Sequence, residues 1–105
     1  MKQKDYKIAK QLKERLSVIV HLVDFRIFGS RARGDEGEYS DMDVFIELEY
    51  LDSQTKRKIR DIVWEVGFEN SLYISPLIFT RNEIEKSPLK ASPILKNINE
   101  EGVTV

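Results

Sequence analysis

The sequence predicts an α+β fold in which helices pack on a small mixed β-sheet, in the order α-β-β-α-β-α. Three observations lead to this prediction. Apolar residues recur at helical spacing in some segments, they alternate as in strands in others, and the connections between strands differ in length. With 105 residues and a hydrophobic content of 41%, the whole chain, residues 1–105, is expected to form one domain around one core.

Composition excludes several classes of protein. The net charge of −1 argues against a general nucleic-acid binder, which usually carries a basic balance. The absence of cysteine excludes disulfides, thiolate metal sites and cysteine nucleophiles, and it fits a reducing compartment. The longest apolar run, residues 18–23, is far too short to span a bilayer. No apolar segment follows the basic start of the chain, so we expect no signal peptide and a cytoplasmic location.

The first half of the chain predicts one helix and two strands. Residues 4–20 carry apolar side chains at helical spacing and charged ones on the opposite side, which indicates an amphipathic helix. Residues 25–28 predict a short strand that ends at Gly29. In residues 41–49 the apolar Met42, Val44, Ile46 and Leu48 alternate with a second set, Asp41, Asp43, Phe45, Glu47 and Glu49, as in a half-buried strand. Only about a dozen residues separate the two strands, so we expect them to be antiparallel.

The middle of the chain predicts a second helix and a third strand. Asp52 or Ser53 is placed to cap the helix, and Gly67 stands where a C-cap glycine is expected. The inward-facing residues of this helix are Ile59, Ile62, Val63 and Val66. Residues 72–79 predict a strand, and because Pro76 has no N–H to donate, this strand is expected at a sheet edge or bulged. A strand joined to the previous one through a helix is expected to be parallel to it.

The remaining residues predict two short helices. Thr80 and Glu83 have the spacing of a capping box, which marks the start of a helix. Ser92 followed by Pro93 is the pattern of a second helix start, and Gly102 is placed to end that helix.

The richest stretch of the chain runs from Gly29 to Glu47 and includes two aspartates on the second strand. Side chains two residues apart on a strand share one face, with Cα atoms about 6.5–7 Å apart, so Asp41 and Asp43 can converge on one ion or on a pair of ions. Mg²⁺ prefers such oxygen ligands and completes its shell with phosphates and water. Zinc fits poorly, because the chain has no cysteine and one histidine. Taken alone, the Asp-x-Asp pattern is more typical of a solvated strand start than of a metal site.

The residues before these aspartates are suited to phosphate. Gly29 has no Cβ to hold a phosphate away from its backbone, and Ser30 adds a hydroxyl donor. If residues 31–34 form a helical turn, the free amides of that turn face the anion too. Arg31 and Arg33 can pair with phosphate oxygens, although both can equally be solvated surface. An antiparallel return of the chain brings the turn and the aspartates to one rim of the sheet.

The sequence GSRARG at positions 29–34, followed by SDMDV at positions 40–44, resembles the signature of the minimal nucleotidyltransferases of the DNA polymerase β-like superfamily. The order of elements agrees with that family from about residue 4 to residue 79. The resemblance implies the nucleotidyltransferase fold, ATP or another nucleoside triphosphate as donor with Mg²⁺, and transfer of a nucleotidyl group to a hydroxyl.

Carried over by position, the resemblance assigns roles to individual residues. Gly29 and Ser30 would hold the β- and γ-phosphates, and Arg33 would contact phosphate or a partner. Arg31 is grouped with them as a nucleotide-binding candidate. Asp41 and Asp43 would bind the metals and so carry catalysis.

One feature departs from the family pattern. Active members have a third carboxylate on the next strand, which helps to bind the metal and activates the attacking hydroxyl. The matching position here is Ser75, and serine supplies neither the charge nor a comparable base. Glu47 shares the face of the aspartates but lies about 13 Å along the strand from Asp43. Glu69 precedes the third strand and would reach the site only if the loop bent back.

Three functional hypotheses follow. The first is an enzyme that moves NMP, most simply AMP from ATP, to a hydroxyl of a protein or small molecule; related small proteins are paired as antitoxins with a HEPN toxin, and some transfer AMP onto it. The second is a weak or inactive nucleotide-binding module that neutralises a HEPN partner by masking. The third is a nucleic-acid binder, which the charge balance does not favour. The small sheet also leaves an apolar face for self-association or a partner, and Trp64 is expected to serve packing or an interface.

Overall fold

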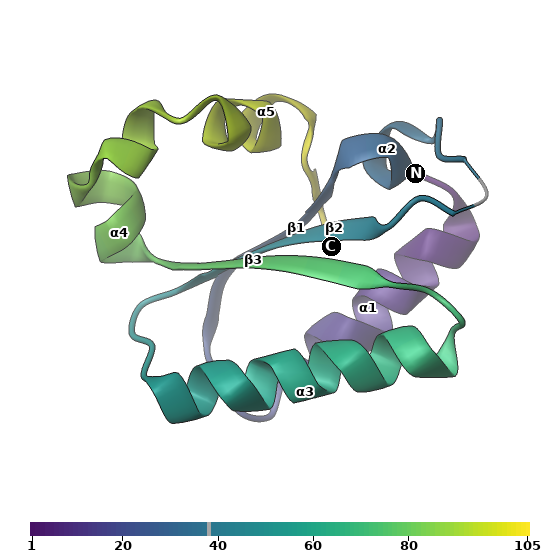
Figure 1. Cartoon of the computed structure of the whole chain (residues 1–105), viewed down its shortest axis with the longest axis horizontal. Helices are drawn as coiled ribbons and strands as arrows, with labels where there is room; N and C mark the ends of the chain where they lie inside the picture. The colour runs from purple at the N-terminus through teal and green to yellow at the C-terminus, as the bar shows by residue number, and fades with distance from the viewer. Residues whose placement is uncertain (38) are drawn as a thin grey trace.

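The structure is a computed structural model that describes residues 1–37 and 39–105, and its centre is a four-stranded mixed sheet (Figure 1). The strands lie in the order β3-β2-β1-β4. In chain order the elements are α1 (Gln3–Ser17), β1 (Leu22–Phe28), α2 (Gly29–Arg33), β2 (Met42–Leu48), α3 (Ser53–Glu69), β3 (Ile74–Thr80), α4 (Arg81–Lys86), the 3₁₀ helix η1 (Pro88–Ala91), α5 (Pro93–Glu101) and β4 (Val103–Thr104).

The strand directions confirm the prediction from connection length. β1 and β2 are antiparallel, whereas β2 and β3 are parallel. The register places Phe28, the last residue of β1, opposite Asp43. On the other side of β2, Asp43 pairs with Ser75 of β3. The end of β1 and the start of both β2 and β3 therefore meet at one edge of the sheet.

Helices cover both faces of the sheet, with α1 and α3 on one face and α4 and α5 on the other (Figure 1). Strand alternation decides which side chain enters which layer. Val44 and Ile46 of β2 belong to the main core beneath α1 and α3. Phe45, which points the opposite way, packs with Leu95 and Ile98 of α5 in a smaller core. Asp43 shares the face of Phe45, beside this smaller core.

Pro76 does lie on an edge strand, as predicted, because β3 is the outermost strand of the described sheet. The capping box of Thr80 and Glu83 is present at the start of α4. Ser92 caps α5, and Gly102 ends it. Asp52, the first of the two candidate caps, accepts a hydrogen bond from the Thr55 amide at the start of α3.

The predicted C-cap at Gly67 is wrong. α3 continues to Glu69, and Ser71 takes the left-handed conformation just beyond its end, with φ 53°. Gly67 is needed for packing instead, because a Cβ there would lie 2.5 Å from the carbonyl oxygen of Leu72. The glycine lets the end of α3 lie tightly against the segment that enters β3.

Other boundaries shift where tertiary contacts override local pattern. α1 stops at Ser17, short of the predicted end at Val20, and β1 begins at Leu22, where a β-bulge adds residues to its pairing with β2. The two-residue strand β4 pairs with Arg26 and Ile27 of β1, and it carries too little pattern to be recognised in sequence. Among the described residues, no helix has the length and apolarity needed to cross a membrane.

Candidate functional site

The glycine-serine turn is the N-terminus of a short helix. β1 ends at Phe28 and α2 starts at Gly29 without a linker, which confirms the helical turn expected after the strand. Left-handed glycines stand at both ends of α2, Gly29 with φ 75° and Gly34 with φ 81°. The Gly34 amide donates to the carbonyl of Ser30 over 2.9 Å and closes the turn. The first amides of α2 have no intrahelical acceptor, which is the arrangement that favours an anion.

Gly29 lies directly against the carboxylate of Asp43. A Cβ built on Gly29 would stand 2.4 Å from Asp43 Oδ2, closer than any side chain can approach. The sequence suggested that this glycine leaves space for phosphate. In the structure the space admits a carboxylate, so the glycine-serine turn and the candidate metal ligand lie against each other.

The charges at this rim influence one another. Burial raises the pKa of Asp43 above its ordinary value, and the charge of Asp41 raises it further, while Arg33 acts in the opposite direction. Asp41 is exposed, and Asp43 is half-buried. Two carboxylates that repel each other in a partly dehydrated position are the donor set that a divalent cation stabilises.

Replacing Asp43 with asparagine is therefore expected to stabilise the metal-free protein at neutral pH by up to about 1 kcal/mol. Because the pKa of Asp43 is higher in the folded protein than in the unfolded chain, its ionisation opposes folding. This penalty is absent below the unfolded-state pKa and complete above the folded-state pKa. Urea unfolding of both proteins at several pH values measures it. The difference in unfolding free energy between the wild type and Asp43→Asn should shrink as the pH falls. A difference that grows at low pH would contradict a raised pKa for Asp43.

Arg33 is an exposed cation at the same rim. Its guanidinium is 46% exposed and donates to Asp35 and Glu101 over 3.2 Å each. The hydrogen bond to Asp35, followed by that to Glu101, raises the pKa of Arg33. Exposed ion pairs of this kind contribute little free energy, so Arg33 can exchange these partners for a phosphate at small cost.

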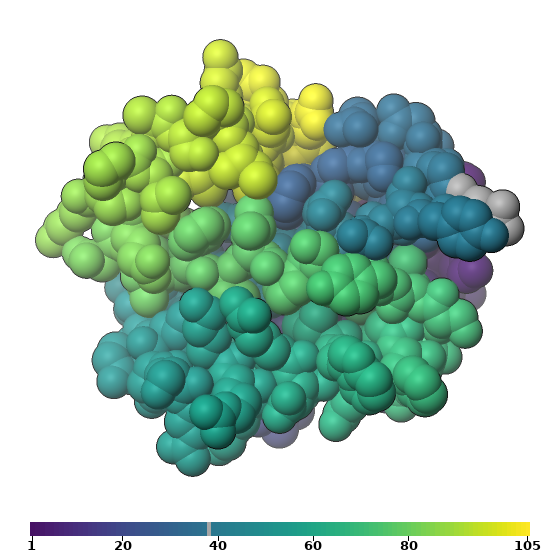
Figure 2. Space-filling view, in the orientation of Figure 1, coloured from purple at the N-terminus to yellow at the C-terminus, as the bar shows by residue number. Residues whose placement is uncertain are grey.

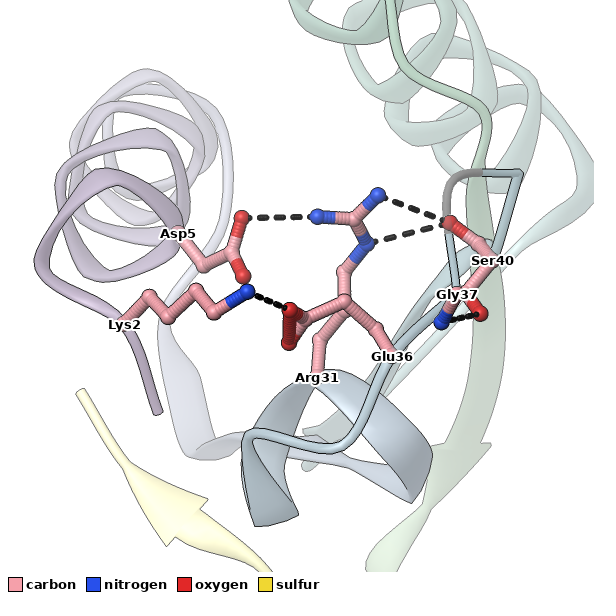
Figure 3. A network of polar contacts seen from close by, with 6 residues as sticks. All are labelled: Lys2, Asp5, Arg31, Glu36, Gly37 and Ser40. Atoms are coloured by element: carbon pink, nitrogen blue, oxygen red, sulfur yellow. Dashed lines mark hydrogen bonds and ion pairs between the residues drawn. The ribbon is translucent and has the colours of Figure 1, made fainter.

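Arg31 takes a different position from Arg33. Its side chain is 14% exposed, and Figure 3 shows the guanidinium lying between Asp5 of α1 and Ser40. Nη1 donates to Asp5 Oδ1 over 2.9 Å, while Nε and Nη2 both donate to the Ser40 carbonyl over 3.0 and 2.9 Å. Arg31 thus ties α1 and α2 to the residue before Asp41. Its contact with nucleotide stays a prediction.

The network around Arg31 contains residues that the sequence reasoning missed (Figure 3). Asp5 is 1% exposed, and Glu36, whose side chain is 6% exposed, forms an ion pair with Lys2. The hydrogen bond to Lys2 lowers the pKa of Glu36. The signal for Asp5 was present, because it stands three and four residues before Ile8 and Ala9, on the apolar side of the first helix.

The third carboxylate is absent from the position where the resemblance requires it. Ser75 pairs directly with Asp43. Glu47 lies near Arg81, with 3.7 Å between Oε2 and Nε, and Glu69 is paired with Arg15 at 2.8 Å. Across residues 1–37 and 39–105, no three His, Cys, Asp or Glu side chains gather to hold a metal ion. Asp41 and Asp43 are therefore the two carboxylates at this rim that could hold a metal ion.

Comparisons with known proteins show the family and the fold of this chain. The family model described as a nucleotidyltransferase domain matches residues 6–103. A Methanocaldococcus jannaschii protein named as a putative protein adenylyltransferase is 35% identical over 77 residues, which cover 70% of this chain and 78% of that protein. The crystal structure of a putative nucleotidyltransferase from Sulfolobus solfataricus has a TM-score of 0.54 and 20% identity, covering 93% of this chain and 76% of that one. This last likeness shows a shared fold.

Proposed function

Because this chain belongs to the nucleotidyltransferase domain family, we propose that it binds a nucleoside triphosphate with Mg²⁺ at the rim between α2 and β2. It then transfers NMP, most simply AMP from ATP, to a hydroxyl of a protein or small molecule. The observation that carries this proposal is the contact between Gly29 and Asp43, which joins the anion-binding turn to the carboxylate pair. The name of the M. jannaschii relative, a protein adenylyltransferase, supports AMP as the group and a protein as the acceptor.

Each rim residue has a role in this proposal. The amides at Gly29 and Ser30 bind phosphate oxygens. Arg33 breaks its exposed ion pairs and binds a phosphate oxygen instead. Asp41 and Asp43 would hold Mg²⁺, since they supply the hard oxygen donors that this ion prefers. When bound, such an ion neutralises triphosphate charge and stabilises the leaving pyrophosphate. The protein itself orients the α-phosphorus toward the acceptor hydroxyl.

The test is calorimetric titration of ATP with Mg²⁺ into the wild type and into Asp41→Asn/Asp43→Asn. Binding that depends on Mg²⁺ and is lost in the double variant is the expected result. The matched control is Glu14→Gln/Glu100→Gln, which removes the same charge from two exposed positions and should bind as the wild type does. Labelled ATP incubated with candidate acceptors then measures transfer. If the wild type binds none of the four nucleoside triphosphates with Mg²⁺, the proposal is wrong.

A second candidate function rests on Ser75. Because serine pairs with Asp43 where a carboxylate is expected, the domain lacks the group that would accept the proton of the attacking hydroxyl. The alternative is a binding module with little catalysis, which neutralises a helical HEPN partner by masking it. An antitoxin role of either kind requires that such a partner bind this chain.

Ser75→Asp separates the two candidates. In the enzyme reading, the new carboxylate beside Asp43 should raise the rate of nucleotidyl transfer by about a hundredfold. The same substitution at exposed Ser53 serves as the control and should leave the rate unchanged. A Ser75→Asp protein that binds Mg²⁺ and ATP but transfers no faster would favour the binding module.

A further inference from the structure

Three large aromatic side chains lie exposed where α3 borders β3. Trp64 is 64% exposed, Phe68 73% and Tyr73 65%, and the rings of Trp64 and Phe68 stack with centroids 5.2 Å apart. They border a pocket of about 480 Å³ that Val63 and Pro76 also line. We call these five residues the α3–β3 patch. Exposed apolar side chains that gather in this way often mark a surface that contacts another molecule.

The α3–β3 patch lies on two elements, α3 and β3, that pack against each other. Gly67 lets α3 lie against the Leu72 carbonyl, and in Figure 2 the surface of α3 (teal) adjoins that of β3 (green) on the face toward the viewer. The aromatic side chains therefore stand on packed elements, so little backbone ordering would oppose their burial in an interface.

The charges of α3 run against its own dipole. Cations favour a helix C-terminus and anions an N-terminus, yet this helix has no acidic residue in its first turn and no basic residue in its last. Its first half carries the cations Lys56, Arg57, Lys58 and Arg60, and its second half carries the anions Asp61, Glu65 and Glu69. A second α3 lying antiparallel would set anions beside cations and oppose the two dipoles.

The edge of β3 makes strand addition a poor alternative. β3 is the outermost described strand, but Pro76, its third residue, cannot donate a hydrogen bond to an added strand. Such a proline is a common means of blocking edge-to-edge pairing. Side chains of α3, rather than backbone groups of β3, are therefore the contacts that a partner can use.

We propose that a second copy of this chain docks on the α3–β3 patch, with the two α3 helices antiparallel about a two-fold axis. Residues 57, 61, 64 and 68 follow the 4-3-4 spacing of a helix–helix seam. Such a contact needs about 800 Å² from each copy, roughly an eighth of the 6584 Å² surface. Glu69 is held by Arg15, so exposed Asp61 and Glu65 are the anions that meet the other copy.

The inference does not rest on the proposed function, because the patch shares no residue with the nucleotide rim. Asp43→Asn should therefore self-associate as the wild type does. A loss of nucleotide binding and a loss of self-association can then be told apart in the same set of variants.

The first measurement is the mass in solution, by sedimentation velocity and light scattering over a range of concentrations. The expected result for the wild type is a species of twice the 12.3 kDa chain mass. Trp64→Glu should weaken dimerisation roughly 30-fold, as expected when a central aromatic anchor is lost. Tyr50→Glu changes an aromatic residue that is 75% exposed outside the patch and should have no effect.

A charge exchange tests the antiparallel arrangement itself. Arg57→Glu/Lys58→Glu makes α3 acidic in both halves, and Asp61→Lys/Glu65→Lys makes it basic in both. Each variant alone should be monomeric, and an equal mixture should form dimers again. A wild type that stays monomeric at every concentration would overturn the proposal. So would a dimer that is indifferent to Trp64→Glu and to the charge variants, because another face would then form it.

Discussion

Replacing Gly29 with alanine should weaken the binding of Mg²⁺ and ATP by roughly 10–100-fold, the loss seen when a group next to a metal ligand is disturbed. The alanine Cβ would stand 2.4 Å from Asp43 Oδ2, so the carboxylate must turn away from the rim. The substitution therefore displaces Asp43, the proposed metal ligand, without changing its charge. Titration of ATP with Mg²⁺ measures it, and circular dichroism checks that the fold is retained.

Gly34 provides the matched control for this substitution. It has a similar left-handed φ of 81°, but a Cβ there would meet nothing within 4 Å. Both alanine variants therefore carry the backbone cost, about 1–2 kcal/mol of stability, and only Gly29→Ala also disturbs Asp43. If Gly34→Ala weakened nucleotide binding as much as Gly29→Ala, backbone strain would explain both results and the contact with Asp43 would not matter.

Much of the fold could be predicted from local pattern together with connection length. The period of residues 41–49 predicts which side chains of β2 share a face, but Phe45 on the second face is buried against α5, so the strand is covered on both sides and is not half-buried. Pro76 limited β3 to an edge position or a bulge, because it has no N–H to donate to a neighbouring strand, and the structure shows the edge position. What could not be predicted depends on contacts that form only when the chain folds. Gly67 has the sequence context of a helix C-cap, and only the approach of the Leu72 carbonyl shows that its small size serves packing.

The candidate site also has features that the sequence predicts and features that it does not. Asp41 and Asp43 could be paired from the period of the strand, and the antiparallel return placed them near Gly29. The two arginines of the motif could not be separated, because both sit in one short helix and carry the same charge. Arg31 is drawn inward by Asp5, which lies 26 residues earlier in the chain, whereas Arg33 faces Asp35 and Glu101 at the surface.

Arg31→Met should destabilise the protein by about 3–5 kcal/mol, because it leaves a buried carboxylate without its counter-charge. Asp5 is 1% exposed, and Arg31 is the only cation that the described structure pairs with it. The same substitution at Arg33 is the control. Since Arg33 and its partners are exposed, Arg33→Met should leave the urea midpoint nearly unchanged.

The double variant Asp5→Leu/Arg31→Met tests whether the buried charge causes the loss. Removing both partners should restore most of the stability, since an apolar pair can replace a buried ion pair at little net cost. Asp5 Oδ2 is already buried without a hydrogen-bond partner among the described residues, which adds to the cost of keeping the carboxylate. Arg31 also holds the Ser40 carbonyl, so the restored protein should still bind Mg²⁺ and ATP more weakly than the wild type. Stability and binding that recovered together would show that Arg31 acts only through Asp5 and does not position Asp41.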